Sequence, residues 1–141
     1  DKDFIYVSAM GNPGRHMEAA VDCRNIASFS LNSRTYDKDG KLSGPHLDMF
    51  AGKFVESALS LFKDNGINVK ACQGHWKMGS FNRNQLEEGM RVHGDLVRAA
   101  KETWSGRLFV SLGFSELNSQ DIDWENRDSN HDVSAVFRKP T

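Results

Sequence analysis

Two histidines are the best candidates for acid–base chemistry. His75 stands in the segment Gln73-Gly74-His75-Trp76, and His93 follows in the next helical segment. The imidazole has its ordinary pKa near neutral pH, so it can accept or give a proton there. Two histidines can cleave RNA through its 2′-hydroxyl without a metal ion. The sequence therefore gives His75 and His93 as catalytic candidates, although a lone histidine is more often a surface residue.

Basic side chains are concentrated between residues 67 and 107. Seven lysines and arginines there exceed the four acidic residues by three charges. They are Lys70, Lys77, Arg83, Arg91, Arg98, Lys101 and Arg107. Such a segment can supply counter-charge to a phosphate, and we expect Arg83 and Arg107 to bind it. The alternative is that these charges only cover solvated helix faces.

Two further segments contain candidate ligand-binding residues. Trp76 can stack on a base or a nicotinamide ring, or it can anchor the core. The run Thr103-Trp104-Ser105-Gly106-Arg107 places hydroxyls and a guanidinium around a glycine, which can seat an anion on free backbone amides. Alternatively, Thr103 or Ser105 caps a helix. The predicted substrate-binding residues are thus Trp76, Arg83, Thr103 and Arg107.

No segment has the spacing of a metal or cofactor site. Cys23 and Cys72 form no CxxC pair, and we expect two free thiols. The acids Asp121, Asp123 and Glu125 can share one face of a strand and bind a divalent cation, but a polar outer face is expected there anyway. The prediction is no cofactor and no metal.

The elements that must position these residues follow from periodicity and turn residues. Residues 4–9 alternate as a strand, residues 17–21 have helical spacing, and residues 26–31 alternate again. A turn is expected at 37–40. The clearest element is an amphipathic helix that begins at Ser43 and ends at Asn65-Gly66, followed by a strand over 67–71 and a turn at 73–76.

The second half is expected to contain helices and a terminal hairpin. Asn84 and Glu87 fit a capping box at the start of a helix that breaks near Gly94. Two further helices meet between residues 103 and 107, and the last ends at Gly113. Residues 122–124 and 133–137 then alternate on either side of a turn at 126–130.

Composition sets the fold class. The 141 residues are 38% hydrophobic and 26% charged, as in an ordinary globular protein. We expect a single domain over residues 1–141, of α+β class, with about three helices packed on a small, mainly antiparallel sheet and a C-terminal hairpin. The net charge of −1 offers no overall basic field, so nucleic acid would need a local patch. No apolar run is long enough to span a bilayer, and membrane insertion is not expected.

One family resemblance covers roughly residues 47 to 138. It rests on Asn65-Gly66-Ile67-Asn68-Val69, Gly74-His75-Trp76, the run from Ala99 to Arg107, Gly113-Phe114, and the run from Val133 to Phe137. These segments resemble the variable C-terminal toxin domains of Rhs, Tc and related polymorphic bacterial toxins. The resemblance implies a secreted effector delivered by a larger carrier into the cytosol of a target cell, with a cognate immunity protein as a partner. It implies no particular reaction.

Three functions remain open from the sequence. The leading hypothesis is a small nuclease that cleaves RNA or DNA, with a nucleic acid or nucleotide as substrate. The first alternative is an NAD-consuming toxin, either an ADP-ribosyltransferase or an NAD glycohydrolase, in which Trp76 or Trp104 could stack on the nicotinamide. No convincing Glu-x-Glu motif is present, which counts against it. The second alternative is a non-catalytic binding or immunity protein.

Overall fold

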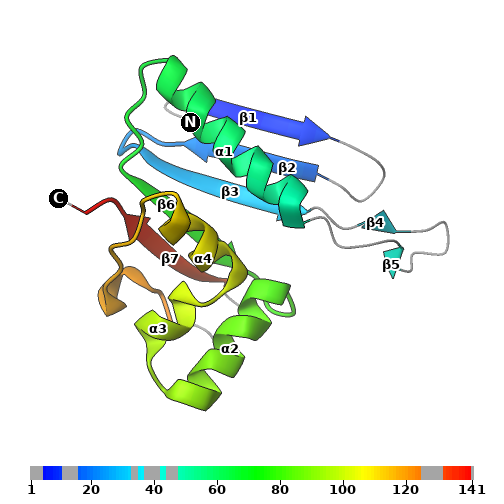
Figure 1. The fold of residues 1–141 in the computed structure, drawn as a ribbon, viewed down its shortest axis with the longest axis vertical. Coiled ribbons are helices and arrows are strands. Elements are labelled where there is room, and N and C mark those ends of the chain that lie inside the picture. Colours follow the sequence, from blue (N-terminus) through cyan, green and yellow to red (C-terminus); the bar gives the residue numbers. More distant parts are fainter. Residues whose placement is uncertain are drawn as a thin grey trace. The chain divides into compact units, whose positions relative to one another are not determined.

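The chain consists of two compact units, residues 1–69 and 70–141, in which helices and antiparallel strands are combined (Figure 1). The predicted α+β class is therefore confirmed. The computed structural model describes residues 5–10, 16–32, 35–36, 42–43, 48–124 and 132–140. The turn predicted at 37–40 and the turn predicted at 126–130 lie outside these ranges.

The first unit contains three strands that pair antiparallel in chain order: β1 (Ile5–Met10), β2 (His16–Val21) and β3 (Ile26–Asn32). Val21 is the partner of Ile5 in β1 and of Ala27 in β3. The strands predicted at 4–9 and 26–31 are confirmed, and each ends one residue later than predicted.

The helix predicted over residues 17–21 is wrong, because this segment is strand β2. Met17, Ala19 and Val21 are buried, whereas Glu18 is exposed. This is the two-residue period of a strand with one buried face. Met17, Ala20 and Val21 also fit a helical spacing, and over so short a segment the two periods cannot be distinguished by apolar residues alone.

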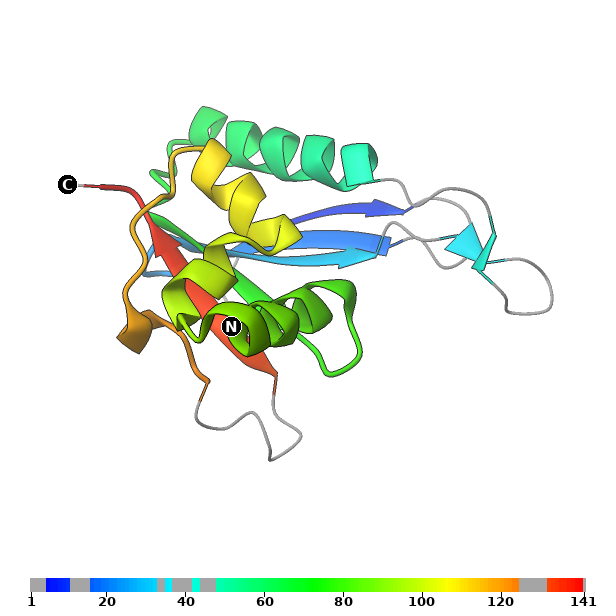
Figure 2. The ribbon, with the colours of Figure 1, turned by 60° about the horizontal axis from the view of Figure 1, so that its bottom comes forward.

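Helix α1 (Asp48–Asp64) packs on β2 and β3, and Figure 2 shows it lying over one face of the strands of its unit. Its buried side chains are Ala51, Phe54, Val55, Ala58 and Phe62. The helix ends as predicted: Gly66 has φ +79°, its N–H donates to Lys63, and the N–H of Ile67 donates to Phe62. This is the Schellman arrangement, which needs a left-handed residue.

The predicted start of this helix at Ser43 is wrong. Ser43 belongs to β5 (Leu42–Ser43), which pairs with β4 (Thr35–Tyr36). The described helix begins at Asp48, five positions later in the chain. A serine followed by proline satisfies the sequence rule for a helix start, but that rule reads only local residues.

In the second unit, β6 (Ala71–Trp76) pairs antiparallel with β7 (Val133–Arg138). Trp76 is opposite Val133, and Ala71 is opposite Arg138. The strand predicted over 67–71 therefore begins only at Ala71, and the turn predicted at 73–76 is wrong. Gly74 favoured a turn in the sequence, but a Cβ there would lie 3.1 Å from the indole Nε1 of Trp76, so the glycine makes room within the strand.

Three helices complete the second unit: α2 (Phe81–His93), α3 (Leu96–Lys101) and α4 (Trp104–Ser111). Helix α4 lies against β6 and β7, and α2 and α3 pack with it (Figure 1). The predicted break at Gly94 is confirmed, with φ +67°. Ser80, and not Asn84, caps α2, since its hydroxyl accepts from the N–H of Arg83.

The end of α4 and the start of the terminal hairpin follow the prediction in part. Gly113 has φ +98° just after α4, as expected. A 3-10 helix, η1 (Ser119–Asp121), then leads to Ile122, which forms a single bridge with Ala135 of β7 and no full strand. Phe137 on β7 packs against Phe109 of α4, with ring centroids 5.4 Å apart. Across the described ranges, no helix is long and apolar enough to cross a membrane.

Candidate functional site

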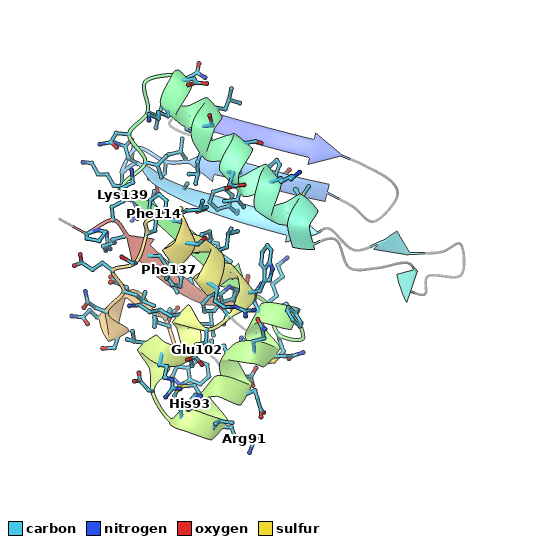
Figure 3. All side chains as sticks on the ribbon, in the orientation of Figure 1. Arg91, His93, Glu102, Phe114, Phe137 and Lys139 are labelled. Carbon is cyan, nitrogen blue, oxygen red and sulfur yellow. The ribbon has the colours of Figure 1, made fainter. Side chains whose placement is uncertain are left out.

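Two arginines and one histidine from the three helices of the second unit act on one carboxylate, that of Glu102. His93 is the last residue of α2, and Glu102 follows the last residue of α3 as its cap. The Nε2 of His93 lies 3.7 Å from the Oε1 of Glu102. Figure 3 shows the two labelled side chains next to each other where α2 and α3 meet. We call His93, Arg98, Glu102 and Arg107 the Glu102 cluster.

The local fold brings these two helix ends together. Gly94 turns the chain in a left-handed conformation, and its N–H donates to the carbonyl of Met90. The carboxylate of Asp95 then accepts from the N–H of Arg98 and starts α3. Gly89 allows the close approach of the helices, because a Cβ on it would lie 2.9 Å from the Cβ of Ala99.

Two arginines, besides His93, stabilise the ionised form of Glu102. The Nε of Arg98, one turn earlier on α3, lies 2.9 Å from the Oε2 of Glu102. This hydrogen bond is the main cause that lowers the pKa of Glu102, and the charges of Arg98, His93 and Arg107 act in the same direction. Glu102 therefore remains a carboxylate across the neutral pH range.

The Glu102 cluster is accessible from solvent. The side chains of Arg98 and Glu102 are each more than half exposed, with 54% and 52% of their surface free, and His93 retains 29%. Arg107 is exposed on α4. Guanidinium and imidazolium donors of this kind bind carboxylates and phosphates alike, and an imidazole can also move a proton. The arrangement can thus hold an anion beside an acid–base group.

His75 is not part of this cluster. It lies on β6 and is exposed, whereas its neighbour Trp76 points to the buried side of the same strand. Among the residues that the structure describes, the imidazole of His75 has no hydrogen bond or ion pair. The ion pairs therefore join His93 and Arg98 to Glu102, and the charge of Arg107 also lowers the pKa of Glu102, but no described contact joins His75 to any of them. The catalytic role of His75 stays a prediction.

Trp76 is a core residue, the alternative that the sequence left open. Its side chain is 2% exposed, and its Nε1 donates to the Oγ of Ser105 at 2.9 Å. Ser105 in turn donates from Oγ to the Oδ1 of Asn82, also at 2.9 Å. The indole also packs edge-on against Phe137. A ring held in this way offers no free face for stacking on a base or nicotinamide.

Arg83 is also buried, with 1% of its surface exposed. Its Nε lies 3.0 Å from the Oε2 of Glu87, one turn later on α2, and its Nη1 lies 3.5 Å from the carbonyl oxygen of Trp76. A buried guanidinium needs such partners, because an uncompensated buried charge is costly. Arg83 therefore has a structural role, and binding of a phosphate would require it to leave these partners.

Thr103 caps α4, as the second reading of its segment predicted. Its Oγ1 accepts from the N–H of Gly106 at 3.0 Å and donates to the carbonyl of Ala100 at 2.8 Å. The other amides of this turn also have partners: Trp104 donates to Gln85, and Ser105 donates to Asn82. The anion seat predicted on free backbone amides is wrong, since side chains of the fold occupy these donors.

Ion pairs divide the basic residues of the 67–107 segment into two groups. Arg83, Arg91 and Arg98 pair with Glu87, Glu88 and Glu102, respectively, each within one helical turn. The other group forms no ion pair with any acid among the residues described here, and consists of Lys70, Lys77, Lys101 and Arg107. Three of the seven basic residues are thus paired within their own helices and four are not paired in the described part of the chain, and Arg107 is the unpaired arginine of the Glu102 cluster.

The metal and thiol expectations concern other parts of the chain. In the described ranges, no group of three or more His, Cys, Asp or Glu side chains is arranged to hold a metal ion. Glu125, one of the three acids considered for a cation, lies outside these ranges. Cys23 is exposed and Cys72 is buried, and both thiols are free. Burial raises the pKa of the Cys72 thiol well above its ordinary value, which makes it a poor nucleophile.

Sequence reasoning missed Glu102, Arg98, Asn82 and Gln85. The spacing of Arg98 and Glu102 indicates only an ion pair within a helix, a common surface feature. What makes Glu102 distinctive is its proximity to His93 and Arg107, which belong to other helices. Comparison with known proteins adds no assignment, since no protein-family profile, no curated protein and no solved structure matches the chain.

Proposed function

We propose that the chain is an enzymatic effector domain that cleaves the phosphodiester backbone of a nucleic acid, with RNA as the substrate that suits its side chains best. His93 is the acid–base group in this proposal. Arg98 and Arg107 supply the positive charge for the phosphate. All three are at the Glu102 cluster of the second unit.

One observation carries the proposal: His93 and Arg107, both singled out by residue type, act on the same carboxylate from different helices. His93 Nε2 lies 3.7 Å from Glu102, and the charge of Arg107 contributes to the lowered pKa of Glu102. Phosphoryl transfer needs such a combination, because positioned positive charge stabilises the transition state while an imidazole moves the proton.

The step proposed for RNA begins with the 2′-hydroxyl. The neutral imidazole of His93 accepts its proton, the 2′-oxygen forms a bond to phosphorus, and the bond from phosphorus to the 5′-oxygen breaks. The departing 5′-oxygen takes a proton either from water or from His75, which the sequence nominated as a second acid but which lies outside the Glu102 cluster. Arg98 and Arg107 neutralise the extra charge on the phosphate oxygens in the transition state.

The biological setting is proposed from the resemblance to polymorphic toxin domains. In this setting a larger carrier secretes and delivers the domain, the domain acts in the cytosol of the target cell, and a cognate immunity protein protects the producer. NAD chemistry is not included, since the indole of Trp76 is buried and only Trp104 is left of the two rings considered for stacking on a nicotinamide.

The test is cleavage by purified protein. Labelled RNA and DNA oligonucleotides are incubated with the wild type, His93→Ala and Arg107→Ala, each with and without a chelator. We expect the wild type to cut RNA. His93→Ala should lower the cleavage rate at least about 100-fold, because general acid–base catalysis typically contributes about 10²–10⁴-fold. Arg107→Ala should lower it about 100-fold, the loss typical for one donor that stabilises transition-state charge. Arg91→Ala is the matched control, since Arg91 pairs with Glu88 away from His93. Failure of the wild type to cut either polymer would refute the proposal.

A binding module is the second candidate, and one observation favours it. Met78, Phe81 and Val92 are large apolar side chains on or next to α2, and they are 57%, 45% and 56% exposed. Large exposed apolar side chains occur at protein–protein contacts. A wild-type protein that cuts nothing and forms a complex which Met78→Ser disrupts would favour this second function.

A further inference from the structure

We propose that Glu102 is an internal counter-ion that occupies a phosphate-binding site formed by His93, Arg98 and Arg107, and that a phosphate group of the ligand must displace its carboxylate. This inference rests on the proposed function and adds the regulation of the same site. The ligand class is a phosphate diester or monoester. The cations that would hold it are already in place, and the carboxylate competes for them.

The geometry of the donors supports this substitution. Arg98 Nε lies 2.9 Å and His93 Nε2 lies 3.7 Å from the two oxygens of the Glu102 carboxylate, and the charge of Arg107 on α4 acts on the same carboxylate. Carboxylate and phosphate oxygens accept the same N–H donors with similar geometry. A phosphate in the place of the Glu102 carboxylate would therefore meet the same donors, together with Arg107.

The exposure of Glu102 makes displacement feasible. A solvent-exposed ion pair contributes little net stability, because water screens its charges and the long side chains lose freedom when they pair. The Glu102 side chain is 52% exposed and can rotate away without unfolding a core. The same side chain would then repel a bound phosphate only weakly, through solvent.

Glu88 provides a matched comparison in the same unit. It pairs with Arg91 three residues later on α2, is 59% exposed, and has its pKa lowered by the hydrogen bond from Arg91. Within the described part of the chain, Arg91 is the one charged group that shifts the pKa of Glu88, whereas His93, Arg98 and Arg107 all shift the pKa of Glu102. Figure 3 places Arg91 at the end of α2, apart from Glu102. Removal of the Glu88 charge should therefore make no comparable group of donors available to a phosphate.

The experiment measures binding without cleavage. A fluorescent 2′-O-methyl RNA oligonucleotide lacks the attacking hydroxyl, and its affinity is measured for the wild type, Glu102→Gln and Glu88→Gln at low and high salt. We expect Glu102→Gln to bind about fivefold more tightly at low salt, because the carboxylate no longer competes for the donors and an exposed ion pair opposes binding by about this factor at most. Glu88→Gln should change the affinity less than twofold.

The controls separate this inference from the proposed function. Circular dichroism establishes that Glu102→Gln is folded. The triple variant Glu102→Gln, Arg98→Ala, Arg107→Ala should no longer bind the oligonucleotide more tightly than the wild type. Equal affinity of folded Glu102→Gln and the wild type would overturn the counter-ion role, even if the wild type cleaves RNA. Tighter binding by Glu102→Gln without any cleavage would support the phosphate site and refute the nuclease reaction.

Discussion

The indole of Trp76 and the hydroxyl of Ser105 are joined by a buried hydrogen bond of 2.9 Å, which ties β6 to the first turn of α4. Ser105 also reaches Asn82 on α2 through both its hydroxyl and its backbone N–H. Three elements of the second unit thus share one polar network. Because α4 also carries Arg107, the network helps to position the Glu102 cluster.

Substitution of Ser105 should destabilise the protein through this network. Ser105→Ala leaves the Trp76 N–H buried without its acceptor, which costs about 1–3 kcal/mol. Urea unfolding, followed by far-UV circular dichroism, measures the free energy of unfolding. Ser111→Ala is the control on the same helix, because Ser111 is exposed and should change stability by less than about 0.5 kcal/mol. Equal effects of the two substitutions would contradict a structural role of the Trp76–Ser105 bond.

Gly106 should tolerate no side chain. A Cβ on Gly106 would lie 2.1 Å from the carbonyl oxygen of Ala100, a backbone atom that cannot move away cheaply. We expect Gly106→Ala to lower the free energy of unfolding by more than about 3 kcal/mol or to prevent folding. Gly89→Ala is the graded comparison, since its Cβ would meet a side-chain methyl at 2.9 Å and alanine favours the helix. Thermal denaturation should rank Gly106→Ala well below Gly89→Ala.

The turn between β2 and β3 should give a pH-dependent contribution to stability. Partial burial acts to raise the pKa of Asp22, but hydrogen bonds from the Arg24 side chain and the backbone N–H groups of Ile26 and Arg24 outweigh it and lower the pKa. A lowered folded-state pKa adds stability above the unfolded pKa of about 4, and this stability is lost as the pH falls through the folded value.

The corresponding substitution is Asp22→Asn. We expect Asp22→Asn to lower the free energy of unfolding by about 1 kcal/mol at pH 7, because the hydrogen bonds to the carboxylate are lost. Near pH 2 the free energies of unfolding of the variant and the wild type should differ by less. Urea unfolding at both pH values measures these free energies. Glu56→Gln on the exposed side of α1 is the control and should show no such convergence. A difference that grows at low pH would contradict the role assigned to Asp22.

The two thiols should differ in reactivity. Cys23 is exposed and should react with a thiol-specific disulfide reagent within minutes, whereas Cys72 is buried with a raised pKa and should react only after unfolding. Absorbance of the released product counts one fast thiol in the native protein and two in denaturant. Cys23→Ser should abolish the fast reaction. A native Cys72 that reacts as fast as Cys23 would show that β6 opens readily.

Local signals in the sequence were sufficient where the structure is local. The helix ends at Gly66, Gly94 and Gly113 were predicted because glycine adopts the left-handed conformation that a helix end requires. A cap at Thr103 or Ser105 was the alternative to the predicted substrate-binding role of Thr103, and Thr103 is the cap. The helix predicted over 17–21 failed because β2 is determined by its pairing with β1 and β3, which local spacing does not report.

The candidate site was predictable only in part for the same physical reason. His93 and Arg107 stand out by residue type, so the sequence could nominate them. Glu102 could not be nominated, because its significance comes from the meeting of the ends of α2 and α3 in space. Arg83 and Trp76 were nominated by type as well, but burial and hydrogen bonding engage both within the fold. Residue type suggests chemistry, and exposure decides whether a ligand can use it.

Growth of host cells should show whether toxicity depends on His93 and Arg107 and not on Arg91. If the domain cleaves RNA in a cytosol, induced expression of the wild type should arrest bacterial and yeast cultures, and His93→Ala and Arg107→Ala should each relieve the arrest. Arg91→Ala should retain it, because Arg91 pairs with Glu88 and not with Glu102.

His75→Ala tests the second acid: relief would place His75 in the reaction, whereas full arrest would assign the proton of the leaving oxygen to water. Western blots must show equal soluble protein for every variant, because a variant that fails to accumulate also relieves arrest. Normal growth with abundant wild-type protein would contradict a catalytic toxin in these hosts and favour the binding module with its exposed Met78, Phe81 and Val92.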